Sequence, residues 1–229
     1  MQADPKDGQD HRSLPQRYSG IPQRPLTPLA AIDPLRRFWR YWMRDHAFLR
    51  VVLPNAYRVD EALWRGGHPG RAQLRRLKAQ GVATILNLRG GSDTVHNATE
   101  RALCAELGIP LVFLETRAGA LPRAEVLHDL LKILRDAPKP LFVHCKSGAD
   151  RTALAVTLYL HVLKGRPLAE ARRAFSWRYG HIRWGKARVL HHFLDAYAEA
   201  HRATGIGFEK WLATGYDPET LIRQHGGGA

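Results

Sequence analysis

The feature that most constrains the fold of this chain is the alternation of short apolar runs with amphipathic helical segments. Nearly continuous apolar runs occupy 82–88, 111–114 and 140–144, and helical spacing predicts helices over 98–107 and 122–135. Parallel strands need long crossover connections, which are usually helices. The pattern therefore predicts an α/β fold with a central, mostly parallel sheet of about four or five strands flanked by helices.

The elements on either side of this pattern are weaker. Loosely spaced apolar residues over 57–65 predict an edge strand, and the Gly-Gly-His-Pro-Gly segment at 66–70 predicts a turn. Pro122 suits the first position of the helix that it opens. The last third of the chain reads as helical, with segments 168–175 and 187–203 around a turn at 179–181.

Length and composition suggest one main domain with extensions. A chain of 229 residues can bury a substantial core. Residues 1–34 are rich in proline among polar residues and are expected to form a mobile tail. Residues 35–54 mix aromatic and basic residues and predict a helical extension, packed on the outside of the domain or in weak contact with an anionic membrane surface.

The charge balance favours anionic partners. The chain has 35 Lys and Arg against 21 Asp and Glu, a formal charge of +14. Such an excess attracts phosphate esters, anionic lipid or nucleic acid, although a solvated basic surface gives the same count. Aromatic residues do not interleave with cations on any predicted pair of strands as stacking platforms would, so no specific nucleic acid is expected.

The cysteines and the apolar runs bear on compartment and cofactors. Only Cys104 and Cys145 are present, and Cys104 lies in an apolar helical pattern typical of a core. Two cysteines without zinc-type spacing predict neither a disulfide framework nor a metal, and we expect no cofactor. Without an apolar run of spanning length or a signal core, we expect a soluble, cytoplasmic protein.

The segment His-Cys-Lys-Ser-Gly-Ala-Asp-Arg-Thr at 144–152 follows the apolar run at 140–144 and opens a predicted helix over 152–163. Backbone N–H groups in a tight loop at a helix N-terminus favour an anion. Gly148 allows the backbone to approach that anion closely. Arg151 can bind two phosphate oxygens with its planar fork. In such surroundings Cys145 is a candidate nucleophile.

This Cys-x5-Arg-Thr loop, preceded by His144, resembles the signature loop of the protein tyrosine phosphatase superfamily. The segments 63–69 and 87–89, the second ending in Arg89, resemble motifs of its small bacterial and fungal dual-specificity members. The resemblance implies a dual-specificity phosphatase-like catalytic domain over 55–203, followed by a C-terminal extension at 204–229. It also implies metal-independent hydrolysis through a phosphocysteine, with Arg151 stabilising the transition state. The phosphate would be held by Cys145, Lys146, Ser147, Gly148, Ala149, Asp150 and Arg151.

The resemblance also implies supporting roles around this loop. Thr152 would donate a hydrogen bond to the sulfur, and His144 would order the loop through backbone hydrogen bonds. Arg89 would contact substrate or loop, or form a surface ion pair. Ala153 departs from the glycine that is common after Arg-Thr.

The sequence departs most from the family pattern at the general acid. The usual Asp on a separate loop is missing from 115–122, where Glu115 is the only carboxylate. The loop itself reads Cys-x-x-Gly-x-Asp-Arg-Thr, similar to myotubularins and some bacterial lipid and tyrosine phosphatases. We therefore favour Asp150 as the acid over a structural role, and keep Glu115 as the second candidate. His181, His191 and His192 lack metal-ligand partners at suitable spacing and receive no role.

Three functions remain open. A phosphatase acting on phosphotyrosine or dual-specificity protein substrates comes first. The cation at Lys146, with Asp150 and the basic charge, also suits a phosphoinositide or inositol phosphate phosphatase. The missing Asp loop allows a non-catalytic module that binds phosphate.

Overall fold

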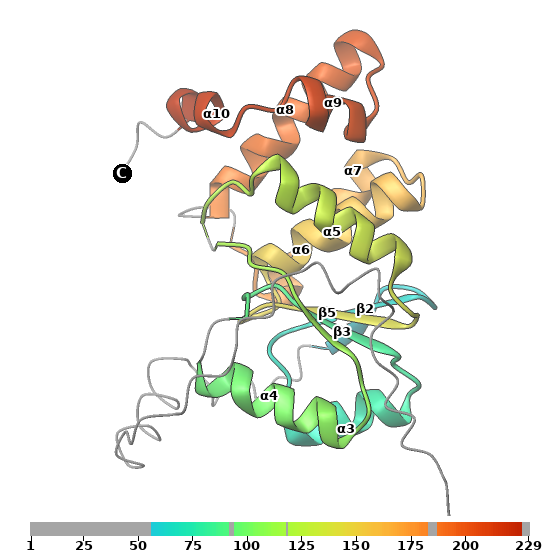
Figure 1. The fold of residues 1–229 in the computed structure, drawn as a ribbon. Helices are drawn as coiled ribbons and strands as arrows, with labels where there is room; N and C mark the ends of the chain where they lie inside the picture. Colours follow the sequence, from blue (N-terminus) through green and yellow to red (C-terminus); the bar gives the residue numbers. More distant parts are fainter. Residues whose placement is uncertain (1–55, 92–93, 118, 183–186, 226–229) are drawn as a thin grey trace, which may run out of the picture.

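The structure is a computed structural model, which describes residues 56–91, 94–117, 119–182 and 187–225. A five-stranded sheet in the order β1-β2-β5-β3-β4 runs through its middle. Helices cover both faces of this sheet (Figure 1). The predicted α/β architecture is confirmed. The proline-rich segment 1–34 and the aromatic-basic segment 35–54 lie outside the described residues.

Four of the five strands are parallel. They are β2 (Leu63–Gly66), β3 (Thr84–Asn87), β4 (Leu111–Phe113) and β5 (Leu141–His144). Strand β5 pairs in parallel with β2 on one side and β3 on the other, with His144 opposite both Gly66 and Asn87. The carboxyl ends of these strands therefore meet at one edge of the sheet, where ligands of open α/β sheets bind.

The prediction of one edge strand over 57–65 is wrong, because two antiparallel strands occupy this region. Strand β1 (Ala56–Arg58) forms the edge and turns back into β2. The side chain of Asp60 stabilises the turn, since its Oδ1 accepts hydrogen bonds from the backbone N–H groups of Ala62 and Leu63, both at 2.8 Å. A short polar side chain that bonds to nearby amides is a common cause of such a reversal.

The helices form two layers. Helices α3 (Arg71–Ala79) and α4 (Val95–Glu106) lie on one face of the sheet, and α5 (Ala124–Asp136) and α6 (Asp150–Leu158) lie on the other (Figure 1). The prediction that Pro122 occupies the first position of this helix is wrong. Arg123 is the extended N-cap residue, with ψ 157°, and α5 begins after it. Helix α6 continues as a π-helical turn, η3 (Tyr159–Leu163).

The last third of the chain is helical, as predicted. It contains α7 (Leu168–Ala171), the 3-10 turns η4 (Arg172–Ala174) and η5 (Trp177–Tyr179), and then α8 (Arg188–Thr204), α9 (Phe208–Thr214) and α10 (Pro218–His225). Residues 204–229 were expected to form an extension, but Phe208, Trp211 and Leu212 are buried in the main core. Helix α9 therefore contributes to the stability of the domain.

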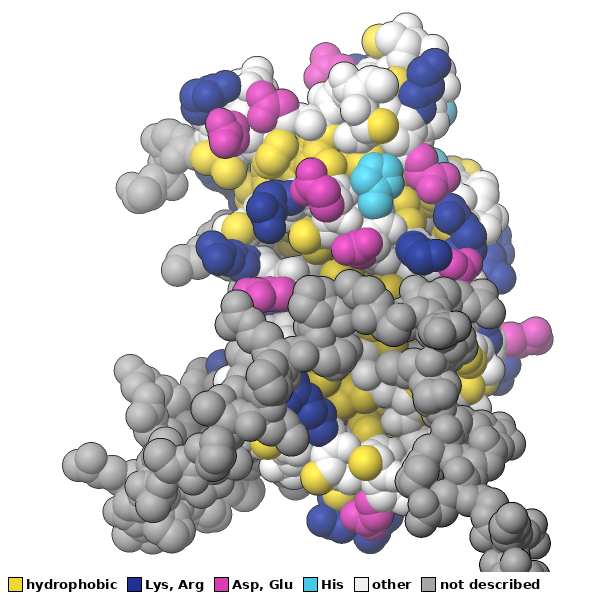
Figure 2. Space-filling view, in the orientation of Figure 1, with side chains coloured by type: hydrophobic (Ala, Val, Ile, Leu, Met, Phe, Trp, Pro, Cys, Tyr) yellow, Lys and Arg dark blue, Asp and Glu magenta, His cyan; other side chains and the backbone are white. Residues whose placement is uncertain are grey.

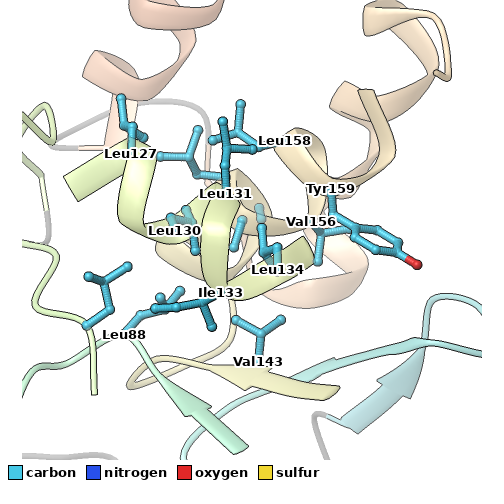
Figure 3. Packing of buried hydrophobic residues seen from close by; sticks show 14 of the residues in the cluster. Leu88, Leu127, Leu130, Leu131, Ile133, Leu134, Val143, Val156, Leu158 and Tyr159 are labelled. Carbon is cyan, nitrogen blue, oxygen red and sulfur yellow. The ribbon is translucent and has the colours of Figure 1, made fainter. Parts of the chain in front are cut away.

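The larger core lies between the sheet and α5. Figure 3 shows the buried face of α5, formed by Leu127, Leu130, Leu131 and Leu134, packed among residues of β5, α6 and η3. A smaller cluster under α3 and α4 contains Cys104, which is 2% exposed. Cys104 is a core residue, and burial raises its pKa to about 12.

Candidate active site

The cysteine loop connects β5 to α6 at the carboxyl edge of the sheet. Helix α6 begins at Asp150, so the backbone N–H groups of its first turn have no acceptor within the helix. Cys145 is 2% exposed, and the N–H of Gly148 donates to its Sγ at 3.3 Å. The loop therefore directs backbone donors and the positive end of a helix dipole toward the sulfur.

The backbone of Gly66 and Gly67 supports this loop from behind. Gly148 has φ +79°, and a Cβ there would lie 2.5 Å from the carbonyl carbon of Gly66 and 2.6 Å from the amide nitrogen of Gly67. The N–H of His68 donates to the carbonyl of Lys146 at 3.2 Å. The turn after β2 thus fixes the position of the cysteine loop.

Arg65, a residue to which the sequence assigned no role, holds the loop from inside the protein. It is 1% exposed and donates to the carbonyl oxygens of Gly148 and Ala174, both at 2.8 Å. Its guanidinium carbon lies 3.8 Å from the ring centroid of Tyr179. Burial lowers the pKa of Arg65 to about 10, which leaves it charged at neutral pH. The sequence does contain a signal for this role, because Arg65 is a charged residue in the predicted strand directly before the Gly-Gly-His-Pro segment.

Arg151 lies at the start of α6 and turns toward the ends of the strands. Its Nη1 donates to the carbonyl oxygens of Thr116 at 3.1 Å and Leu88 at 3.4 Å. It lines a small depression together with Leu88, Thr116 and Leu154. The hydroxyl of Thr152 donates to the carbonyl oxygen of Gly66 at 3.5 Å, instead of to the sulfur as expected.

The two candidate acids lie in different surroundings. Asp150 Oδ1 is 2.6 Å from Nδ1 of His181, whose Nε2 is 2.8 Å from Nε2 of His191. Glu115 is exposed and lies across an antiparallel backbone bridge from Arg89. The structure therefore brings Asp150 together with two histidines that the sequence analysis had set aside.

A buried polar cluster lies behind His144. Nδ1 of His144 is 3.2 Å from the carbonyl oxygen of Cys145, and its Nε2 is 2.7 Å from Oε1 of Glu100. Nδ1 of His68 is 3.8 Å from Oε2 of Glu100. Burial raises the pKa of the Glu100 carboxyl, but the attraction to His144 and His68 and the hydrogen bond from Asn87 together outweigh burial, and the net pKa lies below the ordinary value.

The same cluster consists of residue types that ligate metals. The ligand atoms of His68, Glu100 and His144 lie within 4.8 Å of one another. Ligands of one tetrahedral Zn²⁺ with bonds of about 2.0 Å would be separated by about 3.3 Å. The 2.7 Å between Nε2 of His144 and Oε1 of Glu100 is shorter, because these two side chains contact each other directly. We interpret the cluster as the support that orients His144 beneath the cysteine loop.

The surface charge is mixed over the face that Figure 2 shows, where Lys and Arg side chains are interspersed with Asp and Glu over the upper helices. Over these helices the view shows a surface of mixed charge and no single polyanion groove. Among the described helices, none combines the length and apolarity needed to cross a membrane.

Comparisons with known proteins agree with this geometry. Residues 54–181, more than half of the chain, match the profile of the family described as DSP-PTPase phosphatase fused to NAD+ kinase. The chain belongs to this family. It is thus a member of the dual-specificity type within the protein tyrosine phosphatase superfamily, as the cysteine loop had indicated.

Two curated relatives illustrate the likeness. The chain is 30% identical over 126 residues to the dual specificity protein phosphatase TpbA of Pseudomonas aeruginosa (strain UCBPP-PA14), covering 53% of this chain and 54% of TpbA. It is also 30% identical over 131 residues to the probable chloroplastic NAD kinase 2 of Oryza sativa subsp. japonica, covering 55% of this chain and 13% of that protein. The chain thus spans about half of TpbA and a small part of the kinase.

Solved structures share the fold. The crystal structure of P. aeruginosa TpbA has a TM-score of 0.50 at 22% identity, covering 74% of this chain and 89% of that chain. The core catalytic domain of the PP-IP phosphatase SIW14 from S. cerevisiae also has a TM-score of 0.50, at 19% identity, covering 66% of this chain and 91% of that chain. At these identities the likeness concerns the fold.

Proposed function

We propose that this protein hydrolyses phosphate monoesters through a phosphocysteine on Cys145, without a metal. The observation that carries the proposal is the placement of the sulfur. Cys145 Sγ accepts an N–H from Gly148 in a loop that opens α6, and Arg151 follows at the position that the superfamily signature requires. Membership of a phosphatase family supports the same reaction.

The first step transfers the phosphoryl group to the enzyme. The phosphate of the ester occupies the loop from Cys145 to Arg151, where backbone N–H groups donate to its oxygens. Arg151 exchanges its bonds to the carbonyl oxygens of Leu88 and Thr116 for two phosphate oxygens. The Cys145 thiolate forms a bond to phosphorus as the ester oxygen leaves, and Asp150 gives that oxygen its proton.

The second step releases inorganic phosphate. A water molecule attacks the phosphorus and gives one proton to an oxygen of the departing phosphate, so Asp150 is still a carboxylate when the step ends. The S–P bond breaks, and the thiolate of Cys145 is restored. Arg151 stabilises the charge that spreads over the equatorial oxygens in both transition states.

Phosphotyrosine and dual-specificity protein substrates come first, because the relative TpbA is described as a dual specificity protein phosphatase. A second candidate is a soluble inositol phosphate or a phosphoinositide. It is favoured by Lys146, a partly exposed cation inside the loop. Parallel assays with a phosphotyrosine peptide, a soluble inositol phosphate and a phosphoinositide in vesicles separate these substrates.

The reaction is tested by hydrolysis of an aryl phosphate in the presence of a chelator, by wild type, Cys145→Ser and Arg151→Lys. We expect turnover by wild type only, with Cys145→Ser at background and Arg151→Lys strongly impaired, since lysine lacks the planar fork. Wild-type activity no greater than that of Cys145→Ser would contradict hydrolysis. Phosphopeptide binding without turnover would instead identify a non-catalytic phosphate-binding module.

A further inference from the structure

The carboxyl group of Asp150 begins a chain of three titratable side chains. Oδ1 of Asp150 is 2.6 Å from Nδ1 of His181, and Nε2 of His181 is 2.8 Å from Nε2 of His191. The three residues come from distant parts of the sequence: the start of α6, the turn after η5, and the first turn of α8. Two consecutive contacts at these distances make a continuous hydrogen-bonded path.

The middle ring of this chain is held rigidly. His181 is 4% exposed, and its ring packs against Phe175 with a centroid distance of 4.9 Å at 75°. Phe175 also contacts the ring of His191 at 5.0 Å. The Asp150 carboxyl, by contrast, is 37% exposed, and His191 is partly exposed. The chain therefore connects two partly exposed side chains through one buried ring.

Proton counting limits what the chain can do. Two ring nitrogens that face each other at 2.8 Å need one proton between them, so one donates while the other accepts. When Asp150 is a carboxylate, Nδ1–H of His181 donates to it, and Nε2 of His181 accepts from His191. When Asp150 is protonated, it donates to Nδ1 of His181, and Nε2–H of His181 donates to His191. Both states satisfy every contact without movement of a heavy atom.

We propose that His181 and His191 form a proton relay that loads Asp150 for its role as general acid. A proton enters at Nδ1 of His191, the proton on Nε2 of His191 moves to Nε2 of His181, and the proton on Nδ1 of His181 moves to Asp150. Each ring gains one proton and gives one up, so both rings end neutral and Asp150 becomes a carboxylic acid. The relay rests on the proposed phosphatase reaction and adds two positioning residues to it.

The relay explains how a loop acid can act where the usual Asp loop is missing. An Asp in the first turn of a helix and beside an arginine tends to stay ionised and to act only as a hydrogen-bond acceptor. A neighbour that can both donate to the carboxylate and accept from the acid removes this restriction, and imidazole is the side chain that does both. Glu115 has no comparable partner among the hydrogen bonds described for it.

The test uses His181→Asn, because Asn places an N–H donor near the position of Nδ1 but cannot pass a proton on. Its kcat is compared with those of wild type and Asp150→Asn on two esters, phenyl phosphate with a poor leaving group and dinitrophenyl phosphate with a good one. An acid contributes about 10²–10⁴-fold where the leaving group needs a proton. We expect His181→Asn to lose about 10²-fold or more in kcat on phenyl phosphate, with KM and the rate on dinitrophenyl phosphate nearly unchanged.

Two further variants complete the design. The double variant Asp150→Asn with His181→Asn is expected to lose no more than Asp150→Asn alone, since both changes remove the same proton. His128→Asn, the same substitution at an exposed residue of α5, is expected to behave as wild type. His191→Gln, which keeps a donor near Nε2, is expected to show a smaller loss on phenyl phosphate only.

Each other outcome contradicts the relay. Wild-type kcat of His181→Asn on phenyl phosphate would show that the hydrogen bond alone suffices. An equal loss on both esters would show that His181 only supports the loop, and a multiplicative loss in the double variant would separate His181 from Asp150. Failure of the phosphatase proposal is distinguishable, because wild type would then hydrolyse neither ester faster than Cys145→Ser.

Discussion

Substitution of Gly148 by alanine tests how closely the cysteine loop depends on the turn behind it. The residue has φ +79°, a conformation that costs an L-residue about 1–2 kcal/mol. The new Cβ would also lie 2.5–2.6 Å from the backbone of Gly66 and Gly67, which is closer than Cβ atoms approach other atoms in folded proteins. Backbone on both sides cannot move as a flexible side chain would, so the collision adds about 1–3 kcal/mol.

The two costs can be separated with a matched control. Gly81 has φ +82°, but a Cβ there would meet nothing within 4 Å. Gly81→Ala therefore carries the conformational cost alone. With a urea dependence of about 2 kcal/mol per molar, we expect the midpoint of unfolding to fall by about 1–2.5 M in Gly148→Ala and by about 0.5–1 M in Gly81→Ala.

Activity should separate the two variants more strongly than stability does. If the loop shifts to relieve the collision, the amides move relative to the phosphate, and a displacement of about 1 Å costs about 10²-fold in rate. Gly81→Ala should keep the wild-type kcat on an aryl phosphate. Equal urea midpoints for the two variants, together with normal kcat in Gly148→Ala, would refute the claim that the turn fixes the loop.

Two further predictions concern the buried polar groups around the loop. Arg65→Met removes two charge-assisted hydrogen bonds to the carbonyl oxygens of Gly148 and Ala174. We expect the unfolding free energy, measured by urea titration, to fall by about 3–5 kcal/mol, and kcat to fall in steady-state kinetics. Unchanged stability would contradict this role of Arg65. Burial lowers the pKa of His68 from 6.5 to about 3, so the unfolded chain binds a proton that the folded protein does not, and stability falls as pH drops below 6.5. The loss of unfolding free energy between pH 7 and pH 5 should be smaller in His68→Gln than in wild type. The depressed pKa of Glu100 does not contribute in this range, because it affects stability only below the usual value of 4.5. An equal loss in wild type and His68→Gln would exclude His68 as the cause.

Much of the fold followed from local patterns. The apolar runs at 82–88, 111–114 and 140–144 contain β3, β4 and β5, since short apolar segments between helices have few alternatives to a parallel sheet. The cysteine loop could also be predicted, because its strand, loop and helix are consecutive in the sequence. The β1–β2 reversal was missed, although Asp60 carries a turn signal.

The parts that sequence analysis missed depend on contacts between distant segments. Arg65 supports the loop 83 positions further along the chain, and such a pairing leaves no local pattern. His181 was set aside because its spacing to other histidines matches no metal site, yet its partner is a carboxylate 31 positions earlier. Proline is common at the first position of a helix, but Arg123 is extended, so α5 begins at Ala124 and not at Pro122.

The account depends most directly on a covalent bond between phosphorus and Cys145. The measurement is rapid acid quench of wild type during turnover of dinitrophenyl phosphate, followed by mass spectrometry of the peptide that contains residue 145. The account predicts a gain of one phosphoryl group on Cys145, formed at the rate of the initial burst of dinitrophenol and missing from Cys145→Ser. Turnover without this adduct, or with a phosphoryl group on another residue, would contradict the proposed mechanism.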